Sequence, residues 1–81
     1  MIQFSLKSIR INAGMTRKEA ADILGIHDQT LGKYEKDSSD IPMSLLEKIS
    51  NLYQTPMNYI FLGKEYDLIR TITLKREQEV K

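Results

Sequence analysis

Apolar residues recur at spacings of three and four along most of the chain, which is the pattern of helices that bury one face. Leu6, Ile9 and Ala13 carry this spacing in the first such segment. The pattern predicts five helices: residues 4–13, the segment from Thr16 to Gly25, residues 28–36, a segment introduced by Ile41 and Pro42, and residues 56–62. The predicted fold class is therefore all-α, with a core built from the apolar faces of these helices.

The second and third predicted helices carry the clearest local signals. Thr16 and Glu19 form the Thr-x-x-Glu capping pattern, in which each side chain bonds the other residue's backbone amide, so a helix begins there. Gly25 suits the left-handed position that ends a helix. In the next helix Leu31 faces inward, and four residues are predicted to face outward: Asp28, Gln29, Gly32 and Lys33. Two short helices joined by a tight turn make a helix-turn-helix unit, which usually presents its second helix to the DNA major groove.

The segments after residue 55 carry weaker signals. Residues 56–62 begin at the proline of a Thr-Pro pair and hold apolar residues expected in the core, including Met57. Residues 64–81 mix isoleucine, leucine, tyrosine and threonine, which favours a strand, before a charged end. A strand has no partner in an all-α domain, so we predict an arm that docks on the core, pairs with a second copy or stays a mobile tail. The predicted organisation is one domain over residues 1–63 and an extension over residues 64–81.

Composition narrows the class of protein. A chain of 81 residues with 41% apolar and 28% charged residues has room for one globular domain with a small core. No run is apolar enough to cross a bilayer and the first residues lack a secretory signal, so we expect a cytoplasmic protein with no membrane partner. With no cysteine and one histidine, neither an enzyme nor a metal or cofactor site is predicted.

The formal net charge of +1 is weak support for a nucleic-acid partner. Phosphate binding depends on whether basic residues share a face, and four of them fall in or beside the helix-turn-helix unit: Arg17, Lys18, Lys33 and Lys36. Neighbouring carboxylates dilute these charges. A scatter of solvated charges therefore stays open as the alternative.

Two more polar positions stand out. Arg10 follows the apolar Ile9 and lies close to the buried stripe, where a guanidinium needs a carboxylate partner, and Glu35 is the natural candidate. Spacing alone gives equal weight to an alternative in which both side chains extend into water. His27 precedes the third helix and is interpreted as a turn or phosphate-contacting residue, with Asp28 expected to cap the helix in its place.

Taken together, the motifs resemble the Xre and phage Cro/CI repressor family of helix-turn-helix DNA-binding domains. The match runs from about residue 6 to residue 63 and rests on order and spacing. Its elements are Leu-x-x-Ile-Arg, Met-Thr-Arg-Lys-Glu-Ala-Ala-x-x-Leu-Gly-Ile, Thr-Leu-x-x-Tyr-Glu and Ile-Pro-x-x-x-Leu-x-x-Ile-x-x-Leu. The resemblance implies a five-helix lambda-repressor-like domain that binds double-stranded DNA as a homodimer, and a transcriptional regulator of the kind often encoded by a prophage.

The resemblance also implies roles for single residues. Asp28, Gln29 and Lys33 would face base edges, with Thr30 near the backbone or a thymine methyl. Glutamine can bond adenine and lysine guanine, while Asp28 would accept from cytosine or cap the helix. The candidates for phosphate contacts, from the resemblance and from their charge or position, are Arg17, Lys18, His27, Lys36, Ser38 and Ser39. A salt bridge between Arg10 and Glu35 is also implied.

Two departures from the family pattern affect the expected interface. The glycine that usually follows the Glu35 position is absent, so Asp37 or the serines after it must make the turn. Gly32 stands inside the third helix, where glycine is about 1 kcal/mol less favourable than alanine, and it is expected to permit a close approach to a base or phosphate.

The near-neutral charge slightly favours an alternative function. The same scaffold would then serve as an antitoxin or anti-regulator module that binds a protein partner through residues 64–81. Co-purification of a partner that survives nuclease and high salt would distinguish this reading from DNA binding.

Overall fold

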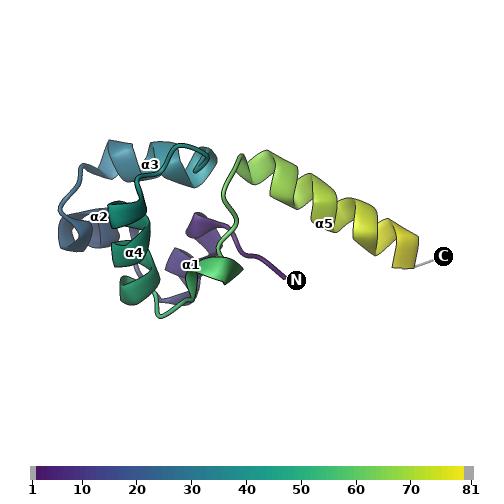
Figure 1. The fold of residues 1–81 in the computed structure, drawn as a ribbon, viewed down its shortest axis with the longest axis horizontal. Coiled ribbons are helices and arrows are strands. Elements are labelled where there is room, and N and C mark those ends of the chain that lie inside the picture. The colour runs from purple at the N-terminus through teal and green to yellow at the C-terminus, as the bar shows by residue number, and fades with distance from the viewer. Residues whose placement is uncertain (1, 80–81) are drawn as a thin grey trace.

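The computed structural model describes residues 2–79 and confirms the all-α prediction (Figure 1). Its elements are α1 (Leu6–Asn12), α2 (Arg17–Leu24), α3 (Asp28–Lys36), α4 (Met43–Leu52), a short 3-10 turn η1 (Met57–Tyr59) and α5 (Glu65–Glu79). The first four α-helices pack into a bundle in which α3 contacts α1 and α2, and α4 contacts α2 and η1. The molecule is elongated, at 46 × 22 × 21 Å, because α5 extends away from this bundle (Figure 1).

Side-chain caps fix the helices that frame the helix-turn-helix unit. The Thr16 hydroxyl accepts from the Glu19 amide at 3.1 Å, and the Glu19 carboxylate accepts from the Thr16 amide at 3.1 Å, so the predicted capping box is present. Gly25 ends α2 in the left-handed region, with φ 74°. Ser5 caps α1 by accepting from the Ser8 amide, so this helix begins at Leu6, two residues later than predicted.

A single apolar core joins the bundle to the segment that follows α4. Leu31 of α3, Ile49 of α4 and Ile60 are its largest fully buried side chains. The rest of the buried apolar cluster comes from α1, α2, α4 and the residue after α4: Leu6, Ile9, Ala20, Ala21, Leu24, Leu46 and Tyr53. The alanines of α2 leave room for its close neighbours, as a small side chain must at a tight helix contact.

The prediction of a fifth helix over residues 56–62 is wrong, since only η1 forms there. Ile60 is extended and pairs with Phe4 in a parallel bridge: the Phe4 amide donates to the Tyr59 carbonyl at 2.7 Å and the Phe61 amide donates to the Phe4 carbonyl at 2.9 Å. The Tyr59 carbonyl and the Phe61 amide thus bond the N-terminal segment in place of the hydrogen bonds that a helix would make. Met57, expected in the core, is 41% exposed as a result.

The expectation of a strand after residue 64 is also wrong, because residues 65–79 form α5. Glu65 and Asp67 lie in its first turn, where a carboxylate favours the positive end of the helix dipole. Several of its apolar side chains are exposed: Tyr66, Ile69, Ile72 and Leu74. In the part of the chain that the structure describes, no helix is long and apolar enough to span a bilayer.

Candidate nucleic-acid interface

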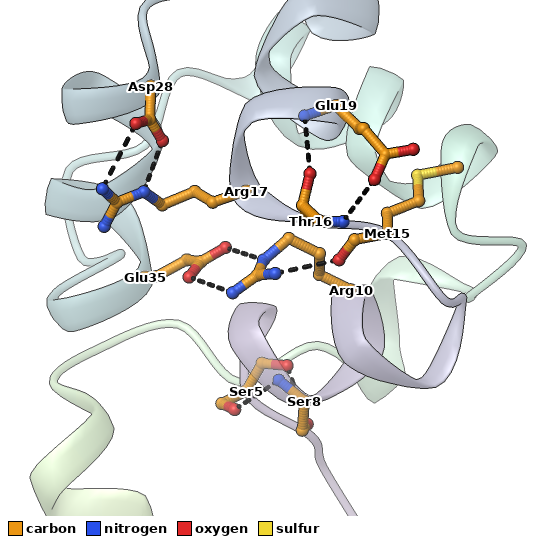
Figure 2. A network of polar contacts seen from close by, with 9 residues as sticks. All are labelled: Ser5, Ser8, Arg10, Met15, Thr16, Arg17, Glu19, Asp28 and Glu35. Atoms are coloured by element: carbon orange, nitrogen blue, oxygen red, sulfur yellow. Dashed lines mark hydrogen bonds and ion pairs between the residues drawn. The ribbon is translucent and has the colours of Figure 1, made fainter.

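A buried ion pair holds α3 in place against α1. The Arg10 Nε and Nη2 atoms donate to the two carboxylate oxygens of Glu35 at 2.7 and 3.2 Å, and Nη1 donates to the Met15 carbonyl at 2.9 Å (Figure 2). The side chains are only 10% and 7% exposed, so the predicted salt bridge forms and the alternative of two solvated side chains does not. The hydrogen bonds to Glu35 raise the pKa of Arg10. One guanidinium thus ties together α1, the turn before α2 and the end of α3.

A second, exposed ion pair bridges the starts of α2 and α3. The Arg17 guanidinium donates to Asp28 through Nε and through Nη2, the latter at 3.3 Å (Figure 2). The two side chains are 46% and 44% exposed. The hydrogen bonds between the two side chains, together with the attraction of their charges, lower the pKa of Asp28 and raise the pKa of Arg17. Asp28 therefore does not cap α3 as expected; His27 holds the cap position, without a side-chain bond to the helix.

Gly32 does not face outward as predicted. It is buried, and a Cβ added to it would lie 2.8 Å from Nη1 of Arg17. The expected close approach of DNA to this glycine is therefore wrong, because the Arg17 side chain covers it. Because glycine has no side chain, the backbone at position 32 leaves room for a guanidinium from α2. This explains why a glycine stands at this position although it lowers the stability of the helix.

The remaining predicted base-contacting residues lie on the accessible side of α3. Gln29 and Lys33 are exposed, and Thr30 is half-buried. Lys33 and Thr30 line a shallow depression of about 500 Å³ together with Tyr34, Lys36, Asp37 and Asp40.

Basic residues of the unit do gather around α3. A second depression, of about 510 Å³, is lined by five basic and three acidic side chains from α1, α2, α3 and α5. Its charged lining is Lys7, Arg10, Arg17, Lys18, Lys36, Asp28, Glu35 and Glu65. Lys36 belongs to both depressions and so joins them. Of the four basic residues singled out in the sequence, each lines one or both of them, which argues against a scatter over the whole surface.

Ser38 is not available to a phosphate, contrary to the sequence prediction. It is 2% exposed, and its hydroxyl bonds the Phe61 carbonyl at 3.1 Å and the Gly63 amide at 3.0 Å. The chain that returns after η1 covers it. Ser39 next to it is exposed, but its hydroxyl and amide both donate to Asp37, which lowers the pKa of that carboxyl.

Comparison with known proteins identifies the arrangement. The family model described as Helix-turn-helix matches residues 6–60. The chain belongs to this family, of the Xre and Cro/CI type. It is 40% identical over 83 residues to the HTH-type transcriptional regulator ImmR of Bacillus subtilis (strain 168), covering 94% of this chain and 65% of that protein. It is 32% identical over 65 residues to the SPbeta prophage-derived uncharacterized HTH-type transcriptional regulator YonR of the same organism, covering 78% of this chain and 60% of that protein. The chain thus spans less than two thirds of the length of these relatives.

The depression beside α3 includes one basic residue that was not singled out from the sequence. Lys7 of α1 lines the same depression as Arg17 and Lys18. Its spacing from Arg10 carried a signal, since residues three apart on a helix share a face. Among the residues that the structure describes, no three carboxylate or histidine side chains are grouped to hold a metal ion.

Proposed function

We propose that this protein is a sequence-specific DNA-binding transcriptional regulator, without catalytic activity, that inserts α3 into the major groove. The observation that carries the proposal is the placement of α3: its inner face is locked by the Arg10–Glu35 pair, and its accessible side chains Thr30 and Lys33 line a depression that Lys36 joins to a second one with five basic side chains. A helix so held can present fixed side chains to base edges. The names of the two relatives, both HTH-type transcriptional regulators and one of them prophage-derived, support a regulator of the prophage type.

Base reading is assigned to the exposed residues of α3. The Gln29 amide can bond adenine in bidentate fashion, and the Lys33 ammonium can donate to guanine, each contributing about 1–3 kcal/mol of discrimination. Thr30 lies beside them, near the DNA backbone or a thymine methyl. The phosphate contacts are assigned to Lys18, His27, Lys36 and Ser39.

The first turn of α3 supports the same placement. No side chain caps this turn, so its free backbone amides and the positive end of the helix dipole are left to attract a phosphate. His27, exposed at the cap position, stands where it would flank that phosphate.

We assign residues 1–63 to DNA binding and residues 64–81 to dimerisation. A cleft of about 430 Å³ between α1 and α5 is lined largely by apolar side chains: Phe4, Ile11, Leu68, Ile69 and Ile72. A projecting helix with exposed apolar residues gains stability when a second copy covers them. Dimerisation would set two copies of α3 one helical turn apart on DNA, about 34 Å.

A second candidate function is supported by that same apolar surface. An antitoxin or anti-regulator would use α5 to bind a different protein. Sedimentation of the purified chain separates the two: a dimer without added partner favours the regulator, whereas a monomer that co-purifies with another protein after nuclease and high salt favours the alternative.

The test of DNA binding is a titration. The protein is used to select from random duplex DNA, and the enriched sequence and a scrambled version are then titrated at about 50 and 200 mM salt. We expect enrichment of one motif, tighter binding to it than to the scramble, and weaker binding at the higher salt because phosphate contacts release counterions. No enrichment, or an affinity that ignores salt, would overturn the proposal.

A further inference from the structure

The Arg17 guanidinium occupies a place on α3 that a side chain of α3 would normally fill. A Cβ at Gly32 would lie 2.8 Å from Nη1, 3.3 Å from Cζ and 3.6 Å from Cδ of Arg17. Asp28, one helical turn earlier on α3, accepts from Nε and Nη2 of the same guanidinium. Figure 2 shows Arg17 reaching from α2 across to Asp28. The outer surface of α3 near its N-terminal half is therefore partly made of a side chain from α2.

The guanidinium keeps hydrogen-bonding capacity in this position. Arginine has five N–H donors, and the bonds to Asp28 use one on Nε and one on Nη2. The edge formed by Nη1 and the second Nη2 donor points away from that carboxylate. The side chain as a whole is 46% exposed and Nη1 lies over Gly32, so the guanidinium stands at the protein surface beside α3. Two parallel donors are what the O6 and N7 acceptors of guanine accept in the major groove.

The pairing with Asp28 makes phosphate a poor target for Arg17. The carboxylate offsets the positive charge of the guanidinium and would itself repel a phosphate oxygen. A guanine edge is uncharged, so the carboxylate adds no comparable repulsion there. It also holds the guanidinium in one orientation, which reduces the conformational entropy lost on binding.

We infer that Arg17 is a base-reading residue that recognises a guanine in the major groove, and that Asp28 and Gly32 are positioning residues that hold its guanidinium on α3. The inference rests on the proposed function and changes two roles that the family resemblance implied. Arg17 moves from the phosphate contacts to the base contacts. Asp28 acts through Arg17 instead of accepting from cytosine.

The test is selection from random duplex DNA with the full chain and three variants: Arg17→Ala, Gly32→Ala and Lys18→Ala. We expect the wild-type motif to contain a G·C pair in each half-site that becomes degenerate with Arg17→Ala and with Gly32→Ala. Arg17→Ala should lower affinity for the wild-type motif about 5- to 150-fold, and for the motif with that G·C pair replaced less than about 2-fold. Lys18→Ala, a matched loss of a neighbouring charge, should weaken both DNAs by the same factor and leave the motif unchanged.

Gly32→Ala separates reading from folding. The three atoms nearest to the added methyl all belong to the flexible Arg17 side chain, and alanine is the better helix former, so the thermal midpoint should not fall. A motif unchanged by both Arg17→Ala and Gly32→Ala, with Arg17→Ala weakening both DNAs equally, would overturn the inference and make Arg17 a phosphate contact. If the wild type enriches no motif, the proposed function fails with it, which is a distinct result.

Discussion

Replacing Glu35 with alanine should test how far the fold depends on the Arg10–Glu35 pair. Among the residues that the structure describes, the change leaves the Arg10 guanidinium, 10% exposed, with the Met15 carbonyl as its one remaining partner. Removing one member of a buried pair typically costs about 3–5 kcal/mol. A chain of this length is expected to have a total stability of about 4–12 kcal/mol, so the loss is a large fraction of it.

Urea unfolding followed by far-ultraviolet circular dichroism measures the effect. For a domain of this size, a loss of about 3 kcal/mol lowers the thermal midpoint by roughly 12–24 °C. Glu35→Gln keeps one acceptor oxygen, but it removes the charge and replaces the other oxygen by an NH2 donor. It should therefore fall between the wild type and Glu35→Ala and remain measurable if the alanine variant is unfolded. Replacing both residues by apolar ones of similar size should recover much of the loss, because no charge is then left buried.

The exposed pair provides the control. Asp28→Ala breaks an ion pair whose side chains are 44–46% exposed, where water and salt screen the charges, so its midpoint should stay near that of the wild type. Equal losses for Glu35→Ala and Asp28→Ala would refute the reasoning, since they would show that burial does not distinguish the two pairs.

Three further predictions concern single groups. Ser38→Ala should destabilise the fold by about 1–3 kcal/mol, because the amide of Gly63 loses its acceptor. The DNA affinity of the folded variant should equal that of the wild type. A loss of affinity at temperatures where the variant is folded would show that Ser38 contacts DNA. Tyr53→Phe should raise the free energy of unfolding by about 1 kcal/mol in urea, because the Tyr53 hydroxyl is buried without a partner among the described residues. Burial raises the pKa of Tyr53 to about 12. The stability of the wild type should therefore fall as pH rises from 10.0 toward 12, and that of the variant should not. Hydrogen bonds lower the pKa of Glu19 and Asp37 from the ordinary values of 4.5 and 3.8. The two carboxylates therefore contribute fully to the stability of the fold above those values, and the contribution should be lost as pH falls below them. A thermal midpoint that is constant through this acid range would contradict the prediction.

The parts of the fold that local chemistry decides could be predicted from the sequence. Thr16, Glu19 and Gly25 act on backbone groups within a few residues, so their pattern alone located both ends of α2. The Arg10–Glu35 pair could not be predicted from local chemistry alone. The spacing of the two residues gave the salt bridge and two solvated side chains equal weight, and the family resemblance favoured the salt bridge.

The errors arose where distant segments meet. Sequence reading treated Gly32 as a gap open to DNA, because nothing near it in sequence indicates that Arg17 fills the space. Ser38 is buried by residues more than 20 positions later, which no local pattern reveals. Similarly, the bridge between Phe4 and Ile60 takes the place of the helix that was predicted over residues 56–62.

The error at α5 has a different cause. The isoleucines and threonines of this segment prefer strands, but their helix propensities are unfavourable by only about 0.7 kcal/mol or less per residue. Within residues 2–79 the structure forms no strand with which they could build a ladder, so the hydrogen bonds of a helix satisfy the backbone instead. A modest preference for a strand is overridden when the strand would have no second strand to pair with.

Gln29→Ala tests whether exposed side chains of α3 read the DNA sequence. The measurement is the affinity of wild type and variant for the selected motif and for a set of motifs with one base pair changed at each position. We predict that the variant loses about 5- to 150-fold of discrimination at one A·T position, with the thermal midpoint unchanged because Gln29 is exposed. A Gln29→Ala variant that discriminates every position as well as the wild type would contradict the placement of α3 in the major groove.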